Sequence, residues 1–226
     1  MIISPGRGYI FVHIPKTGGT SVALALEERA MKEDILIGDT PKARRRKGRL
    51  KGLGARGRLW KHARLADIEG VLTADEIAAQ RIVTIARNPW DRMVSYYHWL
   101  RRQEFDHPAV TRAKGTGFGD FLRHPGTRAE MARDQISEYL RLSDGRVPPA
   151  TVLRFEHLAH DVQAFGQTLG VTLDLTHANA SDRPDRWRTL YDAQTRQLVA
   201  RAYAADIASQ GYAFEAGNSS DCTNRP

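Results

Sequence analysis

A short apolar run that ends in a glycine-bearing turn is the first segment able to bind an anion. Tyr9–Ile14 is predicted to be a buried strand, and Pro15–Gly19 is predicted to form the turn after it. We expect Thr20 or Ser21 to cap a helix that runs to about Met31. Glycines let a backbone approach an anion closely, and the amide groups of a helix start bind phosphate or sulfate oxygens.

The side chains of this turn add a charge and several donors to the backbone amides. Lys16 supplies a point charge, and Thr17, Thr20 and Ser21 supply hydroxyl groups. The lysine precedes the glycines, so the segment lacks the G-x-x-x-x-G-K-[ST] spacing of nucleoside triphosphatases. A purely structural turn between a strand and a helix would have a similar sequence, so this motif alone leaves both interpretations open.

A second strand is followed by a second helix start, again with a basic residue at the junction. Arg81–Ala86 is predicted to be a strand, and Asn88 is predicted to cap a helix whose first residue is Pro89. Arg87 then lies at the end of the strand, where an α/β sheet presents its ligand crevice.

Within that helix, Ser95 shares a face with Arg92, and a guanidinium with a hydroxyl there can hold one phosphate from two sides. We interpret Asp91 as an ordinary surface charge. Because two anion-binding segments occur in one chain in this order, Arg87 and Ser95 are better explained as phosphate ligands than as surface residues.

The two segments together resemble the two signatures of the sulfotransferases that use 3′-phosphoadenosine-5′-phosphosulfate (PAPS). The matching stretches read H-I-P-K-T-G-G-T-S and R-N-P-W-D-R-M-V-S-Y-Y, and they are most similar to carbohydrate O-sulfotransferases and their bacterial relatives. The resemblance spans roughly residues 8 to 214. Weaker similar features stand at Glu138–Leu140, Val152–Leu158, His177–Ser181, Tyr203–Asp206 and Gly211–Tyr212.

The resemblance implies a role for each matching residue. In that family the first loop binds the 5′-phosphosulfate and the second binds the 3′-phosphate, which Arg87 and Ser95 would contact here. Asn179 and Ser181 are assigned by resemblance to the surroundings of the 3′-phosphate or the adenine. The residues implied at the sulfate end are Pro15, Lys16, Thr17, Gly18, Gly19, Thr20 and Ser21. The implied reaction moves a sulfuryl group from PAPS, as co-substrate and without a metal, to an acceptor hydroxyl, expected on a carbohydrate or glycoconjugate.

Sulfuryl transfer needs a cation near the leaving oxygen and a base for the acceptor proton. Lys16 is the predicted cation. His62 is the predicted base, because imidazole titrates near neutral pH and related sulfotransferases often carry a Lys-His pair at this place. The alternative is that His62 is one more member of a basic surface loop. His13 is predicted to be a buried, structural histidine.

Positive charge is concentrated in one segment. Lys42 to Arg64 holds eleven Lys or Arg and no Asp or Glu, and its glycines favour a mobile loop rather than a helix. Three interpretations stay open: a solvated loop, a clamp for an acidic glycan or similar anion, and a nucleic-acid contact. No RNA- or DNA-binding motif accompanies the segment, which counts against the third. Four aromatic residues could stack on adenine or a sugar or else belong to the core, namely Trp60, Trp90, Tyr96 and Trp99.

Composition sets the broad class. The 226 residues, with a net charge of +8, fit a single domain over residues 1–216 and favour an anionic partner, and residues 217–226 are expected to be a disordered tail. The one cysteine, Cys222, excludes an internal disulfide, and the first residues lack a signal peptide's apolar region. No apolar stretch reaches membrane-spanning length. We therefore expect a cytoplasmic protein, whose oligomeric state the sequence does not define.

Strands that alternate with helices predict an α/β fold in which a parallel β-sheet is flanked by helices on both faces. A third strand is expected at Thr151–Phe155. The resemblance implies the P-loop-containing, nucleotide-hydrolase-like fold of sulfotransferases. The predicted helices are Ala63–Glu69, Ala74–Gln80, Phe118–His124, Glu130–Leu142, Glu156–Leu169 and Trp187–Ser209, the last in one or two pieces.

Two other functions remain possible on these residues. A small-molecule kinase of the phosphate-loop class would need a triphosphate loop and acidic magnesium ligands, and no acidic residue ends the strands at Ile14 or Ala86. A non-catalytic nucleotide- or glycan-binding module would not need Lys16 or a base, yet the sequence has both.

Overall fold

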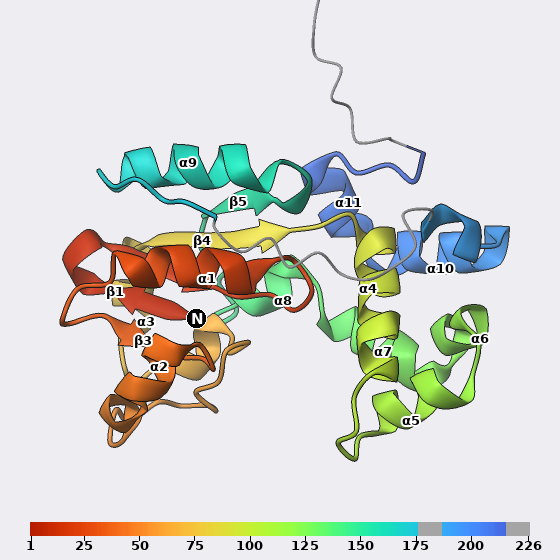
Figure 1. Cartoon of the computed structure of the whole chain (residues 1–226), viewed down its shortest axis with the longest axis horizontal. Coiled ribbons are helices and arrows are strands. Elements are labelled where there is room, and N and C mark those ends of the chain that lie inside the picture. The colour runs from red at the N-terminus through yellow and green to blue at the C-terminus, as the bar shows by residue number, and fades with distance from the viewer. Residues whose placement is uncertain (176–186, 216–226) are drawn as a thin grey trace, which may run out of the picture. The chain divides into compact units, whose positions relative to one another are not determined.

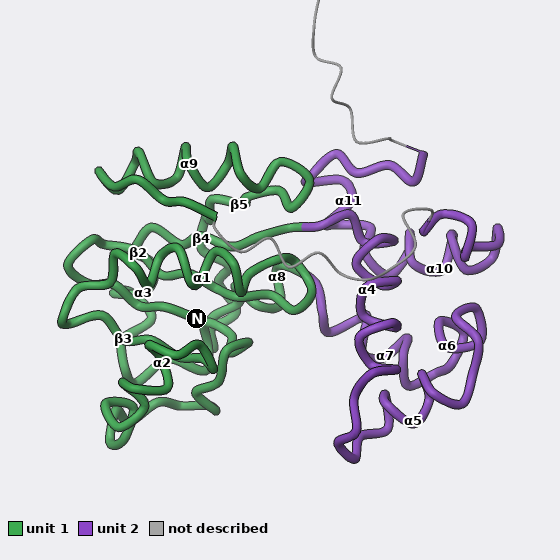
Figure 2. The backbone as a smooth tube through the Cα atoms, viewed as in Figure 1, with its two compact units in different colours: residues 1–86, 136–180 green, residues 87–135, 181–226 purple. Residues whose placement is uncertain are grey.

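The described chain consists of two compact units. The structure is a computed structural model that describes residues 1–175 and 187–215. One unit is Met1–Ala86 with Ile136–Ala180, and the other is Arg87–Gln135 with Ser181–Pro226 (Figure 2). Neither unit is continuous in sequence, and the single domain over residues 1–216 stays a prediction. The tail expected over residues 217–226 lies outside the described residues.

The first unit is built on a five-stranded sheet of order β3-β1-β2-β4-β5. Its strands β2, β4 and β5 are parallel, whereas β1 is antiparallel to both β2 and β3. The strand bounds are β1 Ile2–Ser4, β2 Tyr9–Val12, β3 Ile35–Leu36, β4 Arg81–Ala86 and β5 Ala150–Arg154 (Figure 1). The α/β class with flanking helices is confirmed, but the sheet is mixed rather than wholly parallel.

The antiparallel strand β1 has a local cause. A single turn of 3₁₀ helix, Pro5–Arg7, joins β1 to β2, and Gly8 closes it in the left-handed conformation with φ of 66°. So short a connection reverses the chain and can only join antiparallel neighbours, because parallel strands need a crossover of a dozen or more residues. A three-residue strand is too short to show a periodic pattern, which is why the sequence did not reveal it.

Successive side chains of β2 serve two separate cores on opposite faces of the sheet. Tyr9 and Phe11 pack with the apolar residues of α1 (Gly19–Glu28) and α9 (Leu158–Thr168). Ile10 and Val12 pack with a second group of helices on the other face. That group comprises the 3₁₀ helix η3 Leu65–Ile68, α3 Ala74–Ala79 and α8 Ile136–Leu140. The sheet is therefore a rigid base for the loops at its edge.

The basic segment begins with a helix, which corrects the sequence prediction. Residues 41–50 form α2 (Pro41–Arg46) and the 3₁₀ helix η2 (Lys47–Leu50) rather than a loop. Thr40 caps α2 by accepting a 3.1 Å hydrogen bond from the Ala43 amide, and Pro41 is the first helical residue. The Thr40 cap and Pro41 favour a helix start, and the arginines in the last turn interact favourably with the negative end of the helix dipole. These local effects outweigh the glycines further along the segment.

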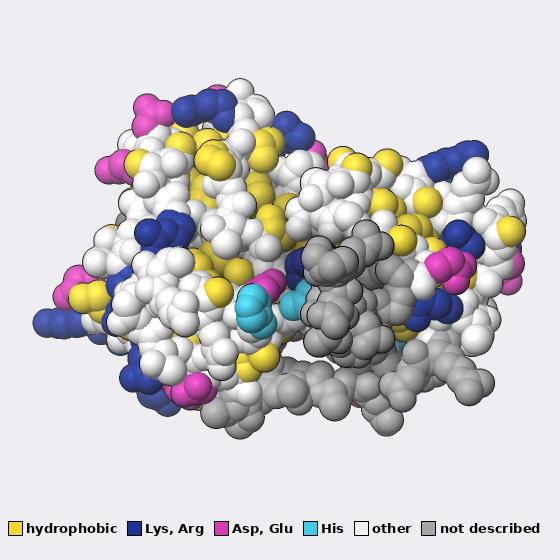
Figure 3. Space-filling model, turned by 90° about the horizontal axis from the view of Figure 1, so that it is seen from above, with side chains coloured by type: hydrophobic (Ala, Val, Ile, Leu, Met, Phe, Trp, Pro, Cys, Tyr) yellow, Lys and Arg dark blue, Asp and Glu magenta, His cyan; other side chains and the backbone are white. Residues whose placement is uncertain are grey.

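Several cations of the segment bind within the first unit. Arg46 donates to the Met31 carbonyl at 2.8 Å, and Arg49 donates to the Lys32 carbonyl at 2.6 Å. Lys42 donates to the carbonyl of Glu27. On the face drawn in Figure 3, the Lys and Arg side chains stand in several separate places rather than in one patch. Part of the basic run therefore stabilises the chain that follows α1.

The described residues of the second unit form helices and their connections, without a strand. The apolar residues that α4 buries are Trp90, Met93, Val94, Tyr97 and Leu100. The helix bounds are α4 Pro89–Arg101, α5 Pro108–Gly115, α6 Phe118–Arg123, α7 Pro125–Arg133, η5 Trp187–Leu190, α10 Ala193–Ala202 and α11 Ala204–Gln210. The helix predicted over Glu130–Leu142 is divided, because α7 ends at Arg133 and α8 begins at Ile136. None of the helices in the described ranges is long and apolar enough to cross a membrane.

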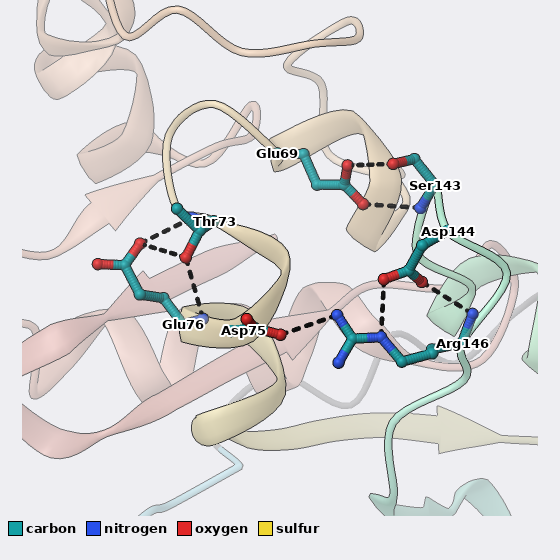
Figure 4. Close-up of polar contacts among 7 residues, drawn as sticks. All are labelled: Glu69, Thr73, Asp75, Glu76, Ser143, Asp144 and Arg146. Carbon is teal, nitrogen blue, oxygen red and sulfur yellow. Dashed lines mark hydrogen bonds and ion pairs between the residues drawn. The ribbon is translucent and has the colours of Figure 1, made fainter.

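A polar cluster on the surface of the first unit joins residues 69–76 to residues 143–146 (Figure 4). The Glu69 carboxylate accepts a 2.7 Å hydrogen bond from the Ser143 amide and a second bond from the Ser143 hydroxyl. Arg146 bridges Asp75 and Asp144 at 2.9 and 2.7 Å. The Glu69 side chain is only 12% exposed, whereas that of Asp75 is 87% exposed.

The two halves of this cluster should differ in their contribution to stability. Glu69→Ala is expected to lower the free energy of unfolding by about 1–3 kcal/mol, because it removes two bonds to a charged acceptor in a shielded place. Asp75→Ala is expected to cost less than about 0.5 kcal/mol, because exposed ion pairs contribute little. Urea unfolding followed by circular dichroism measures both, and equal losses would contradict the difference in burial.

Candidate anion-binding site

The turn between β2 and α1 has an unusual backbone. Lys16 has a φ of 65°, and it is the one non-glycine residue with a positive φ in the described part of the chain. Gly18 follows with a φ of 83° and is the N-cap of α1. The expectation that Thr20 or Ser21 caps this helix is therefore wrong, and the helix begins at Gly19. Two left-handed residues so close together turn the chain sharply at the helix start.

Both glycines are also required by their neighbours. A Cβ atom on Gly18 would lie 2.9 Å from the Phe155 ring and 3.2 Å from a Leu158 methyl group. A Cβ atom on Gly19 would lie 2.1 Å from the ring of His13. Larger residues would push these side chains or the turn out of place. The start of α1 is thus pressed against the imidazole of His13, with no room for a side chain between them.

The hydroxyl groups of the turn are not equivalent. Thr17 is 1% exposed, and its Oγ1 donates a 2.8 Å hydrogen bond to the Ile14 carbonyl. This bond closes the turn and uses the hydroxyl proton that the sequence suggested for an anion. Ser21 is buried in the first turn of α1, whereas Thr20 is half-buried.

His62 lies beside this turn although 49 residues separate it from His13. Its Nδ1 is 2.8 Å from the carbonyl oxygen of His13, and the two imidazole rings are 4.6 Å apart in an edge-to-face arrangement. A turn closed by the Ala63 amide and the Trp60 carbonyl at 2.9 Å holds His62 in position. Lys16 and His62, the two catalytic residues predicted from the sequence, therefore both lie in the first unit. His62 is hydrogen-bonded to His13, the first residue after β2.

The bond to His13 fixes the tautomer of His62. A carbonyl oxygen only accepts hydrogen bonds, so Nδ1 of His62 carries the hydrogen and Nε2 of the neutral ring carries the lone pair. Burial lowers the pKa of His62 to about 4, against the raising effects of the His13 bond and of Asp39. Lys61 and the amino group of Met1 add to the lowering. At neutral pH the ring is therefore uncharged and can accept a proton.

His13 is a buried structural histidine, as the sequence predicted. Its ring stacks on Phe11 with centroids 5.9 Å apart and meets Gly19 on another side. Burial, followed by repulsion from His62 in its protonated form, holds the pKa of His13 well below its usual range. His13 thus acts as a neutral spacer between the helix start and His62.

Lys61, which precedes His62, forms an ion pair with another part of the first unit. Its Nζ forms a 2.7 Å ion pair with Asp39. The lysine of the Lys-His pair therefore holds residue 61 against the chain that leads into α2. The cation nearest to the helix start in sequence remains Lys16.

The second predicted segment begins α4 as expected. Asn88 caps α4 by accepting a 3.2 Å bond from the Trp90 amide. Arg87 Nε donates to Asp91 Oδ2 at 2.8 Å, and both side chains are buried. The interpretation of Asp91 as an ordinary surface charge is wrong, because a carboxylate four residues along the helix neutralises and orients the buried guanidinium.

Ser95 is buried in α4, and its neighbour Arg92 is held within the second unit. Arg92 donates to the carbonyl and the carboxylate of Asp134 at 3.0 and 2.6 Å. The expected pairing of Arg92 with Ser95 on one phosphate would have to compete with that ion pair. Asn179 and Ser181 lie outside the described residues.

The two predicted segments follow neighbouring parallel strands of the sheet. β2 and β4 are parallel neighbours with Val12 opposite Thr84, so both strands end at the same edge of the sheet. The first predicted segment follows β2 directly, and Arg87 follows β4 directly. Ligands of open α/β sheets bind at that edge. In residues 1–175 and 187–215, no three His, Cys, Asp or Glu side chains gather as a metal site requires.

Comparisons with known proteins give little further information. No family model and no curated protein matches the chain. Among solved structures, the chain is similar to mouse sulfotransferase SULT7A1 complexed with PAP. The identity is 13%, the TM-score is 0.45, and the match covers 91% of this chain and 85% of the mouse chain.

The low pKa of His62 has a measurable consequence. In the unfolded chain this histidine becomes protonated near pH 6.5, whereas in the folded chain it becomes protonated only near pH 4. The contribution of His62 to the free energy of unfolding is therefore complete above pH 6.5 and is lost as the pH drops toward 4. Nitrogen-detected NMR of the folded protein should show the Nδ1–H tautomer down to about pH 4.5. His62→Gln should lose less stability between pH 7 and 4 than the wild type, and a midpoint near 6.5 would contradict the buried neutral ring.

Proposed function

We propose that this protein is a sulfotransferase that moves a sulfuryl group from PAPS to a hydroxyl of a carbohydrate or glycoconjugate. The observation that carries the proposal is the occurrence of two basic strand-to-helix segments after two adjacent parallel strands, with sequences that resemble the two sulfotransferase signatures. A half-buried, neutral imidazole beside the first segment supports transfer rather than binding alone.

In this proposal the start of α1 binds the 5′-phosphosulfate. The backbone amides near Gly18 and Gly19 and the positive end of the helix dipole would receive the anionic oxygens. Thr20 and Ser21 would add hydroxyl contacts, and the buried Thr17 would keep the turn closed. Pro15 would fix the entry into the turn.

The second segment is proposed to bind the 3′-phosphate of the donor through Arg87 and Ser95. A guanidinium that Asp91 orients is suited to charge-assisted hydrogen bonds with a phosphate. Asn179 and Ser181 are proposed at the 3′-phosphate or adenine on the strength of the sequence resemblance alone. A cytoplasmic location stays a prediction.

The proposed chemistry uses two groups of the first unit. The acceptor oxygen forms a bond to sulfur while the bond from sulfur to the bridging oxygen of the 5′-phosphate breaks. Lys16 stabilises the charge that develops on the departing phosphate. The acceptor proton passes to Nε2 of His62, which carries the lone pair in the observed tautomer.

A ligand-binding comparison tests the proposal against the two other functions. Adenosine 3′,5′-bisphosphate (PAP) should raise the melting temperature, whereas ATP with magnesium should raise it much less. Stabilisation by ATP with magnesium alone would favour a kinase. Stabilisation by PAP without transfer of labelled sulfate to any sugar of an acceptor panel would favour a binding module.

Two substitutions separate chemistry from donor binding. Lys16→Ala should lower kcat about 100-fold or more while the Kd for PAP changes only a few-fold, because the charge on the bridging oxygen develops only in the transition state. His62→Ala should lower kcat about 100-fold and remove the acidic limb of the pH–rate profile. Small, equal effects of Lys16→Ala on kcat and Kd, or an unchanged profile in His62→Ala, would refute these roles.

Donor fragments isolate the second segment. Ser95→Ala and Arg87→Lys should weaken PAP about 10-fold, yet leave the affinity for adenosine 5′-phosphosulfate, which lacks the 3′-phosphate, almost unchanged. Calorimetry of both ligands gives the ratio, and circular dichroism checks that the buried Arg87 position still folds. Equal weakening of both ligands would show that this segment does not recognise the 3′-phosphate.

A further inference from the structure

Trp60 is an exposed tryptophan that is nevertheless held in a defined place. It is 42% exposed, whereas Trp90 is 4% exposed and belongs to the core of the second unit. Its ring lies edge-to-face against His62, with centroids 5.1 Å apart and an interplanar angle of 87°. The turn closed by the Ala63 amide fixes its backbone.

A solitary exposed aromatic residue needs no functional explanation. Trp60 differs because it ends a line of contacting groups that begins at the proposed donor loop. Gly19 touches the ring of His13, His13 touches His62, and His62 touches Trp60. The line runs from the buried start of α1 to solvent within a single unit, and the proposed base is its third member.

A cation accompanies the ring. The guanidinium of Arg58 lies 5.5 Å from the centroid of the Trp60 ring, in the range of a cation–π contact. Arg58 is exposed, so an incoming ligand can reach it. Other cations of the basic segment, such as Arg46 and Lys61, are occupied within the protein. An aromatic surface and an available guanidinium therefore stand together next to His62.

We propose that Trp60 and Arg58 form the acceptor subsite, and that it takes a sugar ring carrying an anionic group such as a carboxylate. This inference rests on the proposed sulfotransferase function and names the acceptor for it. The apolar C–H face of a sugar stacks on the indole, which directs a hydroxyl on its rim toward Nε2 of His62. The guanidinium of Arg58 binds the anionic group and selects charged sugars over neutral ones.

Matched acceptors test the two residues separately. A β-glucoside and a β-glucuronide with the same aglycone differ only at C6, which is a CH2OH group in the first and a carboxylate in the second. Trp60→Ala should raise the acceptor KM about 10-fold for both sugars, and Trp60→Phe should restore part of the loss. Arg58→Gln should raise KM about 10-fold for the glucuronide alone. The Kd for PAP should stay at the wild-type value in all three variants.

Two control variants lie outside the proposed site. Phe105→Ala removes another exposed aromatic side chain, and Arg128→Gln removes another exposed arginine. Both should keep the wild-type KM for either sugar. A readout without turnover is the indole N–H signal of Trp60 in NMR, which should shift on addition of the glucuronide and shift less in Arg58→Gln.

The outcomes distinguish this inference from the proposed function. Wild-type KM values in Trp60→Ala and Arg58→Gln, with PAP binding and sulfate transfer intact, would overturn the acceptor subsite and leave the sulfotransferase in place. Transfer to acceptors without a sugar, with no shift of the Trp60 signal by any anionic sugar, would also overturn it. Failure of the wild type to bind PAP would overturn the proposed function and the subsite with it.

Discussion

The close contact between the His13 ring and the backbone of Gly19 is the constraint on which the candidate site depends. It determines where α1 can begin, because a residue with a side chain at position 19 would collide with the imidazole. It also buries that imidazole, so its neighbour His62 packs against an uncharged ring. The same residue, His13, offers its carbonyl to His62. His13 thus contacts the helix start through its ring and the proposed base through its carbonyl oxygen.

Burial and hydrogen bonding act on His62 in opposite directions, and burial prevails. The bond to the His13 carbonyl favours the protonated ring, yet desolvation keeps the pKa at about 4. A base with so low a pKa is weak in the absence of ligand. An anionic donor beside it would raise that pKa through Coulomb attraction for the imidazolium. The proton affinity of His62 would therefore increase when an anion binds beside it.

Much of the fold followed from patterns in the sequence. β4 was predicted with its observed bounds, and the start of α4 was given by Asn88 and Pro89, because caps and prolines act locally. The predictions that proved wrong depend on burial and on backbone conformation. Asp91 is buried and pairs with Arg87, and Gly18 replaces Thr20 as a cap because the turn after β2 is left-handed. Residue type and spacing alone show neither feature.

For the candidate site, too, the sequence indicated some residues and missed others. Lys16, the glycines and His62 were proposed from residue type and from family resemblance, and the structure adds the contact of His62 with His13. The contact of Trp60 with His62 was not predicted, since spacing along the chain does not reveal which of several aromatic residues faces solvent.

The interrupted order of the two units affects how the chain acquires its structure. The sheet of the first unit is incomplete until β5 joins β4, and the whole of residues 87–149 is synthesised between these strands. During synthesis at the ribosome, one edge of β4 stays uncovered while that long insertion emerges. Completion of the sheet is then a late, long-range event, typical of chains that fold slowly and rely on chaperones during the delay.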